Sequence, residues 1–254
     1  MRSRDIAAGA PCWIDLSTSD TDTARAFYAG VFGWTALEAD AQFGGYFMFN
    51  GAGGVPVAGC APAMEGFPTD RWQVYLTVED AAKTLESTAE HGGRVLVGPM
   101  QIGDAGTMGV VADPAGVTIG LWQPGDFGGT VNAGEPGLPS WFELHARSYD
   151  TQTAFYRDVF GWNIQQLASD PFRYSVLSHG EEQLAGIMDG GEDFAWGIYI
   201  WTNDADATLA RAAELGGKVV HPAEDTPYGR LATVEDPCGA RFKLMAPNTQ
   251  MPGA

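Results

Sequence analysis

The chain has 254 residues, 45% of them hydrophobic, which is enough for two domains of common size with separate cores. It carries 14 basic and 32 acidic residues, a formal net charge of −18. Such a surface repels nucleic-acid phosphates and anionic lipid, so we expect neither a nucleic-acid nor a membrane partner.

Cysteine content and hydropathy indicate a cytoplasmic protein. The three cysteines are too few and too scattered for a disulfide framework or a cysteine-rich zinc site. No apolar run approaches the length of a membrane span, and the first ten residues lack the apolar core of a signal peptide. We therefore expect buried free thiols in a reducing compartment.

The first clear periodicity predicts a strand followed by a helix. Residues 12–17 alternate between the two faces of a strand. The aromatic pair Phe27 and Tyr28 belongs to a helical repeat over residues 22–32. Gly33 then stands where a left-handed residue ends a helix.

Short strands complete this unit, and its pattern then recurs. Apolar runs between Gly-rich turns predict strands at residues 34–37, 46–50 and 57–60. A strand over residues 73–78, a helix capped by Asp80 and closing strands at 108–112 and 118–122 repeat the βαβββ order.

The second half of the chain replays the first. Residues 139–162 are identical to residues 11–34 at half of their positions. Between the halves lies a stretch rich in Gly and Pro, which is typical of a linker. We expect a first domain at 1–124, a linker at 125–138 and a second domain at 139–254, each with two βαβββ units.

Three motifs recur in this order in both halves: FYxxVFGW at the end of a helix, GG after a second helix, and DPxG before the last strand. The set resembles the vicinal oxygen chelate superfamily of glyoxalases, bleomycin-resistance proteins and extradiol dioxygenases. It is most similar to the two-domain glyoxalase-like proteins of actinomycetes. The resemblance implies an α+β fold of four βαβββ modules in two tandem domains with cup-shaped mixed sheets.

The resemblance also implies where a divalent metal would be bound, namely by His or Glu on the first and last strands of each module. In this chain those positions fall on Trp13, Gln73, Trp141 and Gly197 for the first strands and on Gly59, Gly120, Gly186 and Lys243 for the last. None offers a carboxylate, an imidazole or a thiolate. We therefore expect no metal site and no cofactor.

Two carboxylates are the candidate catalytic groups. Asp15 and Glu143 occupy the same place in the two copies, on the strand face of Trp13 and Trp141. A buried carboxylate needs a partner, so each could serve a structural hydrogen bond or accept a proton from a substrate phenol or enol. If the domains pair as glyoxalase subunits do, Lys243 meets Asp15; if each domain closes its own cup, Lys243 meets Glu143.

Aromatic residues and a few polar ones mark the candidate ligand-binding surface, although some of the aromatic residues would equally serve as core. The candidates for substrate binding are Trp13, Gln73, Tyr75, Trp122, Trp141, His145, Tyr199 and Lys243. An aromatic cavity with few polar anchors suits flat, apolar molecules.

Three functions fit the sequence. The first is metal-independent binding, and acid/base conversion, of a hydrophobic or aromatic small molecule such as the polyketide-type intermediate that the resemblance suggests. The second is sequestration of such a molecule as a means of resistance. The third is a metal-dependent lyase or dioxygenase with displaced ligands. Because tandem domains supply the pairing that single-domain relatives obtain by dimerising, we expect a monomer, with weak dimerisation left open.

Overall fold

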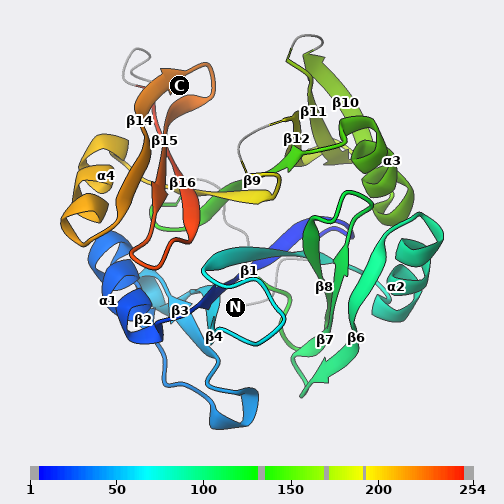
Figure 1. Ribbon diagram of the computed structural model, residues 1–254, viewed down its shortest axis with the longest axis horizontal. Helices are drawn as coiled ribbons and strands as arrows, with labels where there is room; N and C mark the ends of the chain where they lie inside the picture. Colours follow the sequence, from blue (N-terminus) through cyan, green and yellow to red (C-terminus); the bar gives the residue numbers. More distant parts are fainter. Residues whose placement is uncertain (1–5, 131–134, 169–171, 191–192, 249–254) are drawn as a thin grey trace. The chain divides into compact units, whose positions relative to one another are not determined.

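The computed structural model describes residues 6–130, 135–168, 172–190 and 193–248 (Figure 1). The elements of the first half are β1 (Pro11–Thr18), α1 (Thr21–Phe32), β2 (Thr35–Ala36), β3 (Phe47–Asn50), β4 (Pro56–Pro62), β5 (Arg71–Thr77), α2 (Ala81–Glu90), β6 (Arg94–Ile102), β7 (Gly106–Ala112) and β8 (Thr118–Pro124), with short 3₁₀ turns at Ala41–Phe43 and Ala52–Gly54.

The second half repeats this order. Its elements are β9 (Pro139–Ala146), α3 (Tyr149–Phe160), β10 (Asn163–Ala168), β11 (Tyr174–His179), β12 (Glu182–Asp189), β13 (Trp196–Trp201), α4 (Ala205–Glu214), β14 (Lys218–Thr226), β15 (Gly229–Glu235) and β16 (Arg241–Ala246). The expected four-module α+β pattern is confirmed.

The strands form two mixed sheets with the same order. That order is β2-β3-β4-β1-β5-β8-β7-β6 in the first and β10-β11-β12-β9-β13-β16-β15-β14 in the second. In every module the first strand runs parallel to the last: β1 with β4, β5 with β8, β9 with β12 and β13 with β16. The remaining pairs within the modules, such as β7 with β8, are antiparallel.

Packing divides the chain into two compact units. The first unit comprises residues up to Trp13, Gln73–Thr130 and Trp141–Trp196. In it α2 packs on α3, and the buried Tyr156 donates to Asp113 of the Asp-Pro turn at 3.4 Å. Tyr156 in turn accepts a hydrogen bond of 3.0 Å from the indole of Trp196.

The second unit comprises Ile14–Trp72, Val131–Ser140 and the chain from Gly197 onward. Here α1 lies beside α4, as Figure 1 shows in blue and orange. The buried Tyr28 donates to Asp236 at 3.0 Å, so the tyrosine of the FY pair and the aspartate of the DPxG turn bind one another in both units. The FY pair therefore belongs to the core of both units.

The Gly-Trp pairs that follow α1 and α3 end the helices and form hydrogen bonds to neighbouring loops. Gly33 has φ 71° and Gly161 has φ 67°, the left-handed conformation expected at a helix end. Trp34 then donates to the carbonyl oxygen of Gly137 at 2.8 Å, and Trp162 donates to that of Gly9 at 3.0 Å. Each indole N–H thus finds a backbone acceptor inside its own unit.

Candidate functional site

The first carboxylate, Asp15, is paired with a tyrosine. Asp15 on β1 lies opposite Gly59 of β4 in the parallel register. The hydroxyl of Tyr46 donates to Asp15 Oδ1 at 3.0 Å. A Cβ on Gly59 would overlap both the Tyr46 hydroxyl and the Asp15 carboxylate, so the glycine gives this pair its space.

The second carboxylate, Glu143, keeps the same arrangement with a different partner. Glu143 on β9 is 7% exposed and lies opposite Gly186 of β12. Its Oε1 is 3.0 Å from Nε2 of His145, which shares its strand face. The hydroxyl of Tyr174 lies over Gly186, where a Cβ would overlap it. The structure therefore brings together two of the predicted residues, Glu143 and His145.

The other two modules place a tyrosine beside the last strand. Tyr75 of β5 lies opposite Gly120 of β8, and its ring covers the glycine so closely that a Cβ would overlap it. Tyr199 of β13 lies opposite Lys243 of β16. The Lys243 ammonium donates to the Tyr199 hydroxyl at 2.9 Å and lies 4.7 Å from the centre of its ring.

A pocket of about 200 Å³ opens beside this lysine in the second unit. Its lining includes Tyr199 and Lys243, together with His221, Glu224, Leu231 and Thr233 from β14 and β15. His221 precedes a proline, a pattern typical of a loop. It is exposed, but it belongs to strand β14, because the Pro222 that follows it interrupts the ladder without ending the strand.

Two of the candidate aromatic residues surround a phenylalanine from the predicted linker. In the first unit the ring centre of Phe127 lies 5.0 Å from that of Trp13 and 6.2 Å from that of Trp122, in edge-to-face geometry. The indole of Trp122 donates to the Phe127 carbonyl oxygen at 2.7 Å. Both candidate tryptophans, Trp13 and Trp122, are thus in contact with the Phe127 ring of the protein.

The last two candidates for substrate binding, Gln73 and Trp141, are both half-buried. The amide of Gln73 donates to the carbonyl oxygen of Val74 at 3.0 Å. Packing places Asp15 and Lys243 in the second compact unit and Glu143 in the first.

The side chains at the last-strand positions that the resemblance assigns to metal ligands do not fit a divalent ion. Gly59, Gly120 and Gly186 supply no donor atom, and tyrosine side chains occupy the space where a longer side chain would begin. Lys243 brings a positive charge, which repels a cation. Within the described ranges, no three His, Cys, Asp or Glu side chains gather to hold a metal.

Sequence reasoning missed Tyr46, Tyr174 and Phe127. Each tyrosine begins or precedes the strand adjacent to the glycine-bearing strand, and its reach over the glycine depends on cross-strand register. The equivalent positions of Tyr46 and Tyr174 in the two repeats were a usable signal. Phe127 gave no comparable signal because its surroundings are typical of a loop.

A protein-family model described as the Glyoxalase/Bleomycin resistance protein/Dioxygenase superfamily matches residues 12–121 and 139–244. The chain belongs to this superfamily, with two tandem glyoxalase domains that each contain a mixed eight-stranded sheet. Over the part of the chain that the structure covers, the helices are too short or too polar to span a membrane.

Two relatives match almost end to end. The chain is 34% identical over 252 residues to "Putative glyoxylase CFP32" of Mycobacterium tuberculosis (strain CDC 1551 / Oshkosh), covering 95% of this chain and 96% of that protein. It is 33% identical over 268 residues to the anthracycline biosynthesis protein DnrV of Streptomyces peucetius, covering 98% and 97%.

Solved structures support the same fold. The Mn(II)-bound glyoxalase from Novosphingobium aromaticivorans matches with a TM-score of 0.67 and 17% identity, covering 97% of this chain and 86% of that one. The 2,3-dioxygenase LapB from Pseudomonas sp. KL28 matches with a TM-score of 0.65 and 14% identity, covering 96% and 94%. At these identities the likeness concerns the fold alone.

Proposed function

We propose that this protein binds a hydrophobic or aromatic small molecule bearing a phenol or an enolisable carbonyl, and moves a proton on it without a metal ion. The relative named for anthracycline biosynthesis supports a polyketide-type intermediate as the ligand. The three cysteines, all within the described residues, form no disulfide, which accords with a cytoplasmic protein, and the tandem domains accord with a monomer.

The observation that carries the proposal is the Lys243–Tyr199 pair at the pocket of the second unit. Lys243 stands at a position where the family typically has a metal-binding carboxylate, and its ammonium donates to Tyr199 at 2.9 Å. A fixed ammonium stabilises an oxygen anion by charge and hydrogen bonding, as a bound cation would. The pair therefore supplies what a phenolate or enolate oxygen needs.

Proton removal needs a base, and the two carboxylates supply candidates of different character. Asp15 accepts from a tyrosine, and Glu143 lies beside an imidazole. When Asp15 takes the proton from the ligand's carbon or hydroxyl, it becomes a carboxylic acid, and the negative charge moves to the ligand oxygen at Lys243 of the same compact unit. Return of the proton completes the step, with no oxidant and no change in electron count.

A suitable probe is 1-tetralone, an aromatic ketone whose α-hydrogens exchange with D₂O only through its enol or enolate. We expect the wild-type protein to accelerate this exchange, followed by NMR. Lys243→Met should weaken binding and slow exchange, whereas Lys218→Met, which removes an exposed charge paired with Glu235 on the same sheet, should change neither. Elemental analysis should find no bound metal ion, and EDTA treatment should leave the exchange rate unaltered.

Variants of the two carboxylates identify the base. Asp15→Asn or Glu143→Gln should lower the exchange rate by roughly 10²-fold or more while retaining affinity, since general acid/base catalysis contributes about that much. Binding of 1-tetralone without any acceleration by the wild type would refute the catalytic part and leave sequestration as the function. Loss of exchange on removal of a tightly bound metal would refute metal independence.

A further inference from the structure

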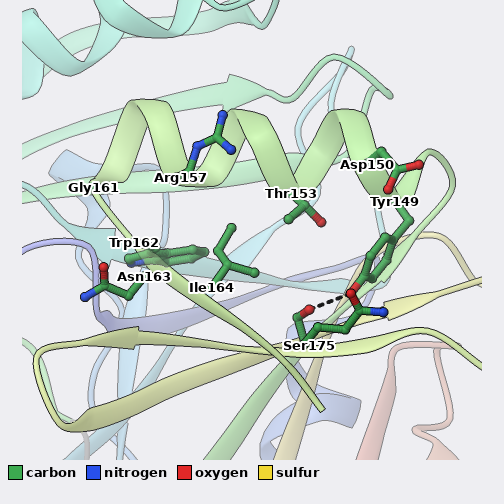
Figure 2. A pocket seen from close by; sticks show the side chains of 10 residues that line it. Tyr149, Asp150, Thr153, Arg157, Gly161, Trp162, Asn163, Ile164 and Ser175 are labelled. Carbon is green, nitrogen blue, oxygen red and sulfur yellow. Dashed lines mark hydrogen bonds between the residues drawn. The ribbon is translucent and has the colours of Figure 1, made fainter. Parts of the chain in front are cut away.

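A second and larger pocket lies in the first unit, on the side of the sheet that faces helix α3. It has a volume of about 580 Å³ and is lined by residues of α3, β10 and β11, among them Tyr149, Thr153, Ile164 and Ser175 (Figure 2). Neighbouring residues of a strand point to opposite faces. Ser175 therefore faces this α3 pocket, whereas Tyr174 next to it lies over Gly186 on the face of Glu143.

The first repeat shows why the α3 pocket is open. The residues of the first repeat that correspond to Thr153 and Ser175 are Arg25 and Phe47. The guanidinium of Arg25 lies 3.4 Å from the centre of the Phe47 ring and donates to the carbonyl oxygen of Leu37 at 2.9 Å. In the second unit these two side chains fill the corresponding space, so the pocket arises from two small residues in place of two large ones.

The inner wall of the α3 pocket presents hydroxyl groups. Tyr149 and Ser175 are joined by a buried hydrogen bond of 2.6 Å, drawn as a dashed line in Figure 2. The Thr153 Oγ1 is buried and has no hydrogen-bond partner among the described residues, and Figure 2 shows its side chain pointing from α3 toward the pocket. A buried hydroxyl without a partner is costly, and a ligand hydroxyl would remove that cost.

Charged residues at the rim of the pocket are already compensated. Asp150 accepts from Arg173 with both carboxylate oxygens, at 2.9 and 3.1 Å. Arg157 donates to both oxygens of Asp158, at 2.8 and 2.9 Å. The polar groups that remain for a ligand are neutral hydroxyls and amides beside the apolar Ile164, so a charged ligand would find no counterion.

We propose that the α3 pocket binds a neutral ring compound carrying hydroxyl groups, with the Thr153 hydroxyl as its anchor. The ring lies against Ile164, and its hydroxyls bond to Thr153 and to the Tyr149–Ser175 pair. The volume lies within the usual range of small-molecule sites. None of the residues assigned to proton transfer lines this pocket, so the two proposals stand or fall separately.

Two probes distinguish the possible sources of such a ring, resorcinol for a phenolic ligand and methyl β-glucopyranoside for a saccharide. Binding is measured by calorimetry and by NMR shifts of residues in α3 and β11. Thr153→Val removes the hydroxyl at nearly constant shape and should weaken binding of the accepted probe by about three- to tenfold. Lys243→Met serves as the control for binding elsewhere and should leave these shifts unchanged.

A repeat-swapped variant closes the pocket. Thr153→Arg with Ser175→Phe introduces the pair that already folds at Arg25 and Phe47, and it should abolish binding of the accepted probe in the α3 pocket. If this variant does not fold, Thr153→Val decides the question alone. The proposal is overturned if neither probe shifts the α3 and β11 signals of the wild type, or if Thr153→Val binds as tightly as the wild type.

Discussion

Replacement of Asp236 tests the contact that joins the two repeated motifs of the second unit. The carboxylate is 3% exposed and accepts four hydrogen bonds. Its Oδ1 accepts from the backbone N–H groups of Cys238, Gly239 and Ala240 at 2.8 to 2.9 Å, and its Oδ2 accepts from the hydroxyl of Tyr28 at 3.0 Å. One side chain thus fixes both the turn and the helix that carries Tyr28.

Asp236→Ala should lower the free energy of unfolding by about 3–4 kcal/mol. Four hydrogen bonds at a net value of about 1 kcal/mol each set this scale, and relief from burying a carboxylate offsets part of the loss. Asp236→Asn keeps an acceptor for the three backbone N–H groups, and the Tyr28 hydroxyl can turn to accept from the new amide. That variant should cost no more than about 1 kcal/mol.

The wild type and Asp236→Asn should also differ in how their stability depends on pH. Burial, the largest cause, raises the pKa of Asp236 above its usual 3.8, although its hydrogen bonds oppose the shift. A carboxyl group whose pKa is raised on folding stabilises the fold most below pH 3.8, and this contribution is lost as the pH rises through the folded-state pKa. The wild type should therefore lose stability relative to Asp236→Asn as the pH rises from 3.8 through the folded-state pKa of Asp236.

Urea unfolding followed by circular dichroism, at several pH values from 3.5 to 7, measures both effects. Asp113→Asn is the matched variant in the first unit, because burial also raises the pKa of Asp113. The reasoning is refuted if Asp236→Ala unfolds within about 1 kcal/mol of wild type. It is equally refuted if the stability difference between wild type and Asp236→Asn grows in the opposite direction with pH.

Three further perturbations have defined outcomes. Gly59→Ala should separate Tyr46 from Asp15 and cost about 1–3 kcal/mol in urea unfolding, because its methyl group takes their space; an unaltered midpoint would contradict that geometry. Phe127→Ala should cost about 2 kcal/mol and alter tryptophan fluorescence, since the ring contacts two indoles; identical spectra would contradict it. Burial raises the pKa of the Cys60 thiol to about 12, so iodoacetamide at pH 8 should leave it unlabelled by mass spectrometry until the protein unfolds.

Local periodicity and the internal repeat were sufficient to predict the modules. A Gly after an aromatic helical repeat has few alternatives to a left-handed cap, and Gly33 and Gly161 both adopt it. Strand alternation likewise puts residues two apart on one face, and Glu143 Oε1 and His145 Nε2 lie 3.0 Å apart. These features depend on residues close in sequence, where a pattern suffices.

Contacts that depend on register or on loop paths were beyond the sequence. Tyr46 reaches Asp15 across β4, and only the register with Gly59 brings them together. Phe127 reaches Trp13 because the chain turns back after β8, through backbone hydrogen bonds to Ala105. Neither arrangement follows from composition, because Gly-rich segments are compatible with many paths.

The three glycines at the assigned last-strand metal positions leave no room for a ligand introduced by a single substitution. A carboxylate introduced at Gly120 would start from a Cβ that overlaps the Tyr75 ring, and one at Gly186 would overlap the Tyr174 hydroxyl. At these three positions the donor atom and the space for it are both absent. Lys243 is the one assigned last-strand position with a long side chain, and it carries the positive charge that the proposed anion requires.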